Sequence, residues 1–375
     1  MSVHGINLAS PEPRKPSRLN ATRQLLHREQ LQESVRLNRQ PGFRNSALAG
    51  LQVAITALIA LPLVQLSPFS HLIGYASLGT LVALFGRFAP SAHRGWIVFL
   101  CLLTQTTTVF VMSLAAWAGT PIELQIALLA LLCGLLFYLV NAGDFGPPGA
   151  LIFIFAASVS MGSVETLDQV LQRTAATAAA AALAWVICML TEAFRHHEPE
   201  TVDSSPPQRA LSHQLIAVGR IILGAAIAAF TAYAVGAQHA GWAAMGAVAV
   251  LQGAHLHINM SRALQRTGGN FIGALLVGVL LATEPSVWTV ILLVAVLTFA
   301  TEAIIGSNYG LGQILVTPMA LLMMYLAAPH AAGVEMVQER IIDTLIGAFI
   351  GMVLAIAFST LDDRAYLARH RSRAR

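Results

Sequence analysis

Long apolar stretches alternate with short polar ones from residue 46 to residue 358. Twelve stretches follow one another, at 46–66, 71–88, 95–117, 122–141, 147–163, 170–191, 213–236, 240–253, 266–283, 286–305, 309–328 and 340–358. A helix that crosses a membrane needs about 17–25 residues. The pattern therefore predicts an all-α integral membrane protein with about twelve transmembrane helices, in which the segments 147–163 and 240–253 are at or below the lower limit of length.

The two halves of this pattern resemble each other. The segment that begins at Gly74 aligns with the segment that begins at Gly241, and Gly79 then stands opposite Gly246. An aromatic residue follows the first glycine in both. Because six spans is an even number, both halves enter the membrane from the same side. We therefore expect two parallel six-helix repeats, related by an axis along the membrane normal, with the functional site between them.

The last apolar segment carries charge and glycine on one helical face. At about 100° per residue, Arg340, Asp343, Thr344, Gly347 and Gly351 fall on the same side of a helix. The two glycines are four residues apart, a spacing that lets another backbone approach closely. We expect these glycines, together with those at the start of the repeated segments, to serve helix packing.

An earlier segment repeats this face in part. Its Arg173, Thr177, Ala180 and Ala184 stand where the last segment has Arg340, Thr344, Gly347 and Gly351. The acidic residue is not repeated, because Ala176 takes the position of Asp343. The duplication therefore leaves two chemically unequal copies.

Composition supports the membrane assignment and excludes several other classes. Hydrophobic residues make up 56% of the chain and charged residues 11%, whereas soluble domains carry about 25% charged residues. Mean hydropathy is +0.67. The three cysteines lie in apolar segments and are expected to be buried. Neither a metal site, a cofactor motif nor a nucleic-acid surface is indicated.

The distribution of arginine predicts the orientation. Cytoplasmic loops carry an excess of basic residues, and this rule puts both termini in the cytoplasm of a bacterial inner membrane. The expected divisions are a basic arm (1–44), the first membrane repeat (45–193), a cytoplasmic linker (194–212), the second repeat (213–360) and a basic tail (361–375). The arm is either a plain cytoplasmic segment or a helix that lies on anionic lipid.

Three arginines within or near apolar spans break the rule and are candidates for substrate binding. Arg220 lies well inside the seventh segment, and Arg340 and Arg173 lie near the outer boundary. A planar guanidinium suits a carboxylate, although long basic side chains also extend from helix ends to water. Arg220 is expected to face a cavity between the halves, with Arg340 nearer the outer exit.

Two acidic residues are candidates for proton coupling. Glu302 lies within the tenth segment, where a carboxylate serves either a proton relay or the neutralisation of an arginine. Asp343 stands one turn after Arg340, and a local ion pair between them is the simpler interpretation.

Three motifs of the second half resemble the fusaric acid resistance family. They are Arg262-Ala-Leu-Gln-Arg-Thr-Gly-Gly-Asn-Phe-Ile-Gly273, Asn308-Tyr-Gly310 with Thr317-Pro318, and Arg340-Ile-Ile-Asp-Thr-Leu-Ile-Gly-Ala-Phe-Ile-Gly351. This family includes the aromatic acid exporters and is distantly similar to plant aluminium-activated malate transporters. The resemblance is strongest over 213–358 and implies a six-span unit that moves organic anions. It also suggests a periplasmic adaptor as a partner, whereas the large cytoplasmic domains of longer members are replaced here by a short linker and tail.

Three functions fit these observations. The first is a secondary exporter of organic anions, aromatic carboxylates among them, driven by the proton gradient. The second is a passive anion channel in which arginines set selectivity. The third is a membrane scaffold or assembly factor without transport. No enzymatic motif is present in the sequence, and the substrate and the oligomeric state are left open.

Overall fold

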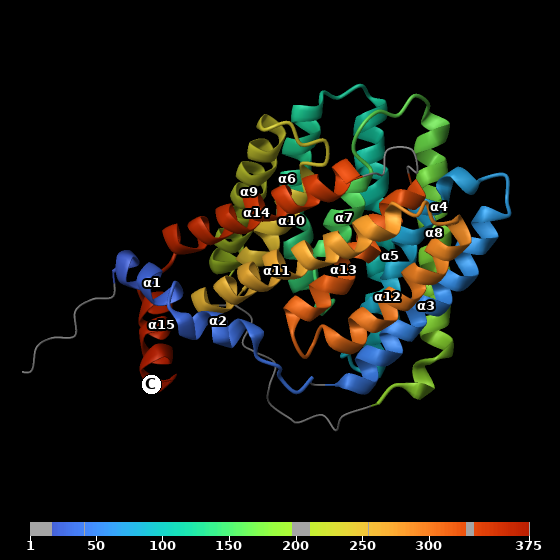
Figure 1. Ribbon diagram of the computed structural model, residues 1–375. Coiled ribbons are helices and arrows are strands. Elements are labelled where there is room, and N and C mark those ends of the chain that lie inside the picture. Colours follow the sequence, from blue (N-terminus) through green and yellow to red (C-terminus); the bar gives the residue numbers. More distant parts are fainter. Residues whose placement is uncertain (1–16, 41, 197–210, 254, 328–333, 375) are drawn as a thin grey trace, which may run out of the picture.

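The computed structural model describes residues 17–40, 42–196, 211–253, 255–327 and 334–374. Within these ranges all regular secondary structure is helical (Figure 1). Nine of the described helices are long and apolar enough to cross a membrane. The expected class, an all-α integral membrane protein, is therefore confirmed. Most of the expected linker 194–212 falls on residues 197–210, outside the described residues.

The nine long helices make up most of the bundle. They are α3 (Phe43–Gln65), α5 (Ser91–Trp117), α6 (Ile122–Ala142), α8 (Leu167–Leu190), α9 (Leu211–Ala234), α11 (Leu256–Leu281), α12 (Val287–Ile304), α13 (Tyr309–Ala327) and α14 (Val334–Ala357). Hydroxyl caps fix where two of them begin: Thr166 accepts from the amide of Gln169 at the start of α8, and Ser286 does the same for Thr289 at α12. Most of these helices bury one face and leave large apolar side chains exposed on the other, as lipid contact requires.

Three short helices lie at the centre. They are α4 (Ile73–Thr80), which continues as the 3-10 turn η2 (Leu81–Leu84), α7 (Leu151–Val159) and α10 (Gly241–Leu251). Every residue of α4 and of α10 is buried. Their glycines and alanines leave little side-chain bulk, so neighbouring helices can surround them on all sides. At 1.5 Å per residue they are much shorter than a hydrocarbon core of about 30 Å. The first-half segment 71–88 therefore contains only a short helix, like the segments 147–163 and 240–253.

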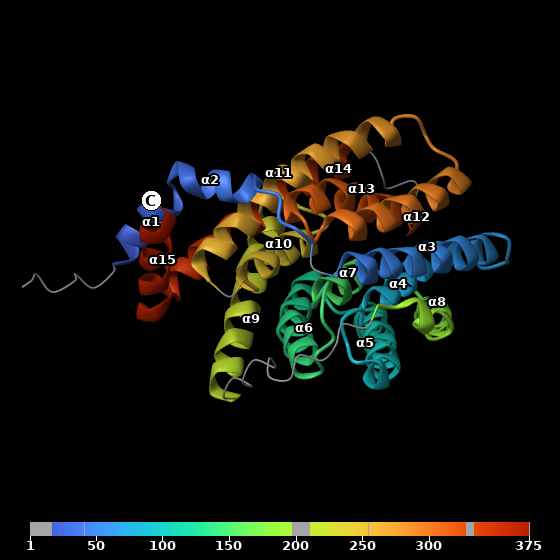
Figure 2. The same ribbon diagram turned by 90° about the horizontal axis from the view of Figure 1, so that it is seen from below.

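Packing between the halves follows one pattern twice. α3 of the first half packs along α12 of the second, and α9 of the second half packs along α6 of the first (Figure 2). In the same way α4 contacts α13, and α10 contacts α7. Within the halves, α4 packs on α8 and α10 packs on α14. Each contact has its equivalent when a helix is replaced by its counterpart in the other half.

The described parts of the two chain ends meet on one side of the bundle (Figure 1). They form α1 (Arg18–Leu25) and α2 (Arg28–Val35) at the N-terminus and α15 (Leu361–Ala374) at the C-terminus. α1 packs against α15, and α2 packs against α11. The Gln30 amide of α2 donates to the Ser261 hydroxyl (2.7 Å) and to the His257 carbonyl oxygen (3.1 Å). The arm is therefore tied to the second half of the bundle.

Candidate functional site

A cavity of about 350 Å³ lies among the central helices, and we call it the inner cavity. Much of its apolar lining comes from four elements, α4 with its continuation η2, α7, α10 and α13, which we call the four central elements: Leu81 and Leu84 of η2, Leu151, Ile152 and Phe155 of α7, Met245 of α10, and Val316, Met319 and Ala320 of α13. Its charged lining consists of Arg87, Arg262, Arg266, Arg340 and Glu302. Four guanidiniums thus face one carboxylate in a mostly apolar chamber between the two halves.

The single carboxylate of the inner cavity is already paired. Glu302 of α12 forms an ion pair with Arg87, which follows η2, and both side chains are almost completely buried. The Gln40 amide donates to the backbone carbonyl oxygen of Glu302 (3.1 Å). The pair joins the second half to the first and leaves the other three guanidiniums without a carboxylate in the lining. The geometry therefore supports one of the two interpretations of Glu302, in which its carboxylate neutralises an arginine.

Arg266 and Arg340 lie close enough to act on each other electrostatically. Arg266 donates to the Tyr309 hydroxyl (3.2 Å) and to the Gln313 amide oxygen (3.4 Å), which are both neutral. Arg340 is 1% exposed, and its Nε and Nη1 have no hydrogen-bond partner within the described protein. Its guanidinium lies over the Trp242 ring, 5.0 Å from the centroid. Two adjacent buried cations therefore lack a carboxylate hydrogen-bond partner among the described residues.

Asp343 does not fill this role. The charges of Asp343 and Arg340 act on each other, but the expected direct contact is not made, because neither carboxylate oxygen of Asp343 has a hydrogen-bond partner among the described residues. The Asp343 side chain is completely buried. Arg340 instead turns toward Trp242 and the inner cavity. Arg340 thus lies at the inner cavity, and its expected place nearer an outer exit stays a prediction.

A polar network joins the three sequence motifs next to this pair of arginines. The Asn270 amide donates to the Thr344 hydroxyl, and the Thr317 hydroxyl donates to the Asn270 oxygen, both at 2.7 Å. All three side chains are buried. Residues from α11, α13 and α14 that were singled out by motif alone therefore meet at one place beside the inner cavity.

A second, larger cavity of about 870 Å³ lies toward the other end of the central helices, and we call it the outer cavity. Its lining includes Tyr75, Arg173 and His239. The Arg173 guanidinium lies over the Tyr75 ring at 5.0 Å. Since Arg173 is the repeat counterpart of Arg340, and Tyr75 that of Trp242, the same cation–aromatic contact occurs once in each half. One copy opens to the outer cavity and the other adjoins the inner cavity.

The glycines predicted for helix packing lie at close helix contacts. A Cβ atom on Gly347 would meet the Ala243 carbonyl oxygen and, at 2.9 Å, the Gly246 Cα. A Cβ on Gly351 would meet the Ala247 carbonyl oxygen at 3.0 Å. The seam between α10 and α14 therefore has no room for a side chain at these positions.

The first half repeats this seam between α4 and α8. A Cβ on Gly79 would meet the Thr177 carbonyl oxygen, and the Thr177 hydroxyl donates to the Tyr75 carbonyl oxygen (3.1 Å). The remaining pair is symmetric as well, because Gly74 faces Ala327 of α13 and Gly241 faces Ser158 of α7. All six glycines thus mark close approaches between helices.

Arg220 lies elsewhere. It is half-buried on α9 and lines neither the inner nor the outer cavity. The acidic group that acts on it is Asp363 of α15. The expectation that Arg220 faces a cavity between the halves is therefore not supported. A long arginine in the first half of α9 can extend toward the tail helix, and the acid lies too far along the chain for a sequence pattern to reveal it.

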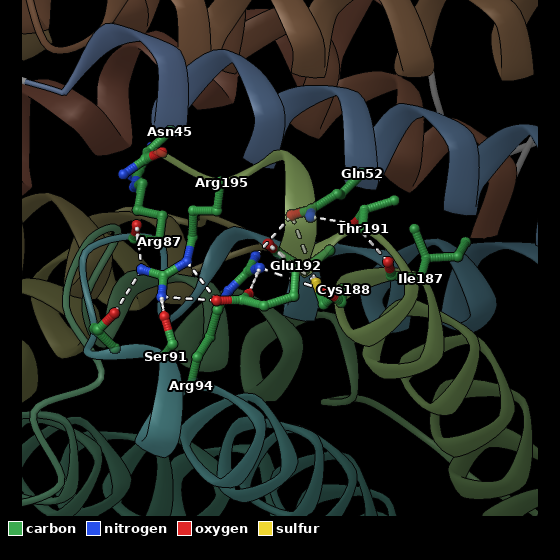
Figure 3. Close-up of polar contacts among 12 residues, drawn as sticks. Asn45, Gln52, Arg87, Ser91, Arg94, Ile187, Cys188, Thr191, Glu192 and Arg195 are labelled. Atoms are coloured by element: carbon green, nitrogen blue, oxygen red, sulfur yellow. Dashed lines mark hydrogen bonds and ion pairs between the residues drawn. The ribbon is translucent and has the colours of Figure 1, made fainter. Parts of the chain in front are cut away.

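A further polar cluster fastens the inner ends of α3, α5 and α8 (Figure 3). Arg94 donates to Gln52 (2.9 Å) and to Glu192 (2.6 Å), and Arg195 donates to the other Glu192 oxygen (2.8 Å). Burial raises the pKa of the Glu192 carboxyl, but the hydrogen bonds and charges of the two arginines outweigh burial and hold its pKa below the ordinary value. Arg195 also donates to the Ala89 carbonyl oxygen (2.5 Å). The cluster thereby steadies the loop that carries the cavity residue Arg87.

Sequence reasoning missed several of these residues. The distribution of arginine along the sequence counts Arg87, Arg94 and Arg266 only as basic charges at the inner membrane boundary. The structure buries all three. Arg266 could have been found from its place in the first family motif, whereas the partners of Arg87 and Arg94 lie 215 and 98 residues away in the chain.

The fold and this buried cationic site define a multi-pass membrane protein. Residues 226–354 match the family described as fusaric acid resistance protein-like, which confirms the resemblance for that part of the chain. A stretch of 122 residues is 29% identical to the uncharacterized membrane protein YvaC of Bacillus subtilis (strain 168) and covers 32% of this chain but only 19% of that protein. No solved structure matches the chain. Together the family match, this relative and the apolar helices are consistent in indicating a multi-pass membrane protein.

Proposed function

We propose that this protein is a secondary transporter that exports organic anions, aromatic carboxylates among them, across a bacterial cytoplasmic membrane, driven by the proton gradient. The chain would cross the membrane twelve times as two parallel repeats, 45–193 and 213–360, with the arm, the linker and the tail in the cytoplasm. The duplicated packing pattern supports this arrangement, since each contact between the halves has its counterpart. A periplasmic adaptor is a partner suggested by the family resemblance.

The adjacent guanidiniums of Arg266 and Arg340 carry the proposal. Keeping a charge within a membrane is costly, so intramembrane arginines usually pair with an anion or with backbone carbonyls. Here neither has a carboxylate hydrogen-bond partner among the described residues. A bound carboxylate could accept hydrogen bonds from both guanidiniums, which is the geometry that arginine favours. The apolar walls around them suit the hydrocarbon part of an organic anion.

Two carboxyl groups provide routes for coupling to protons. Glu302 would neutralise Arg87 when ionised and release it when protonated. Asp343 stands one helical turn from Arg340 without a hydrogen-bond partner among the described residues, so its charge would oppose the binding of an anion and its protonation would favour it. Both are proposed coupling residues on these grounds.

The test is transport by the purified protein in lipid vesicles, with benzoate and malate as probes. Arg340→Ala should abolish uptake of the transported probe. Arg340→Lys keeps the charge but loses the planar fork, and should weaken affinity about tenfold, the equivalent of about 1.4 kcal/mol. Size-exclusion chromatography checks that each variant is folded.

Arg220→Ala is the matched control, because it removes an arginine from a membrane helix without touching either cavity. It should transport like the parent. Loss of transport in Arg220→Ala, with Arg340→Ala active, would move the binding site to α9 and refute the proposal. Flux that responds to the anion gradient but not to a pH gradient would indicate a channel instead.

A further inference from the structure

The inner and outer cavities lie along the same four central elements. Each element lines the outer cavity at one end and the inner cavity at the other: Tyr75 of α4 and Leu81 of η2, Ser158 and Phe155 of α7, Gly241 and Met245 of α10, and Met324 and Ala320 of α13. Both cavities therefore lie between the two halves, one above the other. A single layer of side chains separates them.

This layer is thin, and on α7 and α10 most of it is made of small residues, whereas α13 contributes Leu321, Leu322 and Met323. On α10 only Trp242, Ala243 and Ala244 lie between Gly241 and Met245, which is about 5 Å of helix. On α7 the corresponding residues are Ala156 and Ala157. Trp242 is 1% exposed and is the largest fully buried side chain of the described protein. The indole is therefore the bulkiest obstacle between the cavities.

Trp242 contacts residues of both cavities. Its ring stacks on His239, which lines the outer cavity, with centroids 4.7 Å apart and an interplanar angle of 13°. The guanidinium of Arg340, which lines the inner cavity, lies over the same ring. His239 is in turn held by Glu339 of α14, through its Nδ1 (2.8 Å) and its backbone amide (2.5 Å).

Within the described part of the chain, no hydrogen bond holds the indole in this position. Its Nε1 is buried and has no partner among the described residues, although buried tryptophan N–H groups usually find one. Rotation of the side chain would thus cost stacking and packing contacts but break no hydrogen bond. The repeat counterpart, Tyr75, already lies on the wall of the outer cavity beside Arg173.

We propose that Trp242 is the gate between the two cavities. When the indole moves from beneath the Arg340 guanidinium, the inner cavity joins the outer cavity, and an anion held at Arg340 passes to Arg173. The passage of an anion rests on the proposed function. The gate itself does not, because it is defined by the two cavities and the layer between them.

The gate can be tested without knowing the substrate. Met245→Cys places a thiol in the inner cavity next to the layer, whereas the native cysteines are completely buried and give a low background. A charged, membrane-impermeant methanethiosulfonate reagent is applied from the side of the outer cavity. Access from that side is calibrated with Glu165→Cys in an exposed loop.

Adding Trp242→Ala should raise the labelling rate at position 245 by about tenfold or more, because access follows the population of the open path. Trp242→Phe, which keeps a flat ring, should remain near the parent. Tyr75→Ala is the matched control and should change little, since Tyr75 already borders the outer cavity. Trp242→Leu replaces the alanine variant if the latter elutes as aggregate.

Unchanged labelling in the folded Trp242→Ala or Trp242→Leu protein would refute the gate. Equal acceleration by Tyr75→Ala would refute it too, since the barrier would then not be specific to Trp242. Vesicle uptake of benzoate is measured in parallel. If the parent moves neither benzoate nor malate while Trp242→Ala opens the path, the transport proposal fails and the gate stands.

Discussion

At the scale of residues, Arg173 and Arg340 occupy equivalent positions in the two halves but line different cavities. Arg173 and Arg340 each lie over an aromatic ring at 5.0 Å, and a guanidinium over an aromatic face is favourable, more so when both are removed from water. The contact holds the side chain in place without neutralising it. Each arginine can therefore use its positive charge to bind an anion while one face of its guanidinium packs against an aromatic ring.

The glycine seam gives a prediction at the same scale. Gly347→Ala should destabilise the protein by about 1–3 kcal/mol, because the new methyl group would collide with the Ala243 carbonyl oxygen and the backbone of Gly246. The matched control is Gly219→Ala, at a helical glycine with nothing within 4 Å of the added atom. That variant should be unchanged or slightly more stable, since alanine is the better helix former. Thermal unfolding in detergent compares the two, and equal midpoints would show that the seam is loose.

Some residues of the site could be predicted from the sequence, and others could not. The two arginines and Gly74, Gly79, Gly241 and Gly246 could be identified because the two halves of the chain resemble each other, and their comparison exposes positions that both halves share. Arg220 was overvalued because a charge in an apolar segment looks the same in sequence whether it faces a cavity or the tail helix. Arg87 was undervalued because its partner, Glu302, lies in the other half.

At the scale of elements, the inner ends of α3, α5 and α8 depend on one carboxylate. Glu192 bridges Arg94, which is 1% exposed, and Arg195. Glu192→Gln should lower stability by about 1–3 kcal/mol, because hydrogen bonds to charged groups are lost and a buried guanidinium is left without its anion. The loop that bears Arg87 should loosen in the same variant.

The pH dependence follows from the lowered pKa of Glu192. A carboxyl group whose pKa is lower in the folded state stabilises the fold above its unfolded pKa, and this contribution disappears as the pH falls through the folded pKa. Unfolding midpoints of the parent should therefore decline on acidification below about pH 4.5. The Glu192→Gln variant should show a smaller decline over that range, and an identical decline would show that other carboxyl groups cause it.

The helical elements themselves were predicted well, but several of their ends were not, since α11 begins at Leu256 rather than at residue 266 and α7 covers only Leu151–Val159. Apolar length located the helices of both halves, since each hydrophobic segment corresponds to a helix. Length alone could not reveal that α4 ends at Thr80, because the 3-10 turn that follows is equally apolar. Burial by neighbouring helices, rather than by lipid, removes the need for that segment to be long.

At the scale of the whole molecule, the Arg87–Glu302 pair connects the two halves beside the inner cavity. If Glu302 couples transport to protons, Glu302→Gln should leave anion binding intact but remove the dependence of flux on a pH gradient. Glutamine keeps an oxygen that can accept from Arg87, so folding should be preserved. Flux in vesicles with and without a pH gradient measures the effect. A variant that still responds fully to the gradient would exclude Glu302 and leave Asp343→Asn to be tested.

The relation between the halves could be predicted from sequence in outline only. Repeated glycines indicated a duplication, and the packing of α3 on α12 and of α9 on α6 is equivalent in the two halves. Which helices meet across the centre could not be deduced, because neither the glycines shared by α4 and α10 nor the shortness of α7 and α10 specifies a packing partner. The two cavities are properties of that arrangement and have no local signal in the chain.

The shortness of α10 has a consequence for how the protein is made. Eleven residues of helix, all of them covered by other helices in the finished molecule, offer too little length to hold a chain in a bilayer on their own. When the ribosome has released this segment, α14, against which it packs, has not yet been synthesised. α9 and α7, which also pack against α10, are already present when it is made, but its burial is complete only once the last hairpin has arrived. Full burial of this central helix is thus a late event, even though it stands in the middle of the chain.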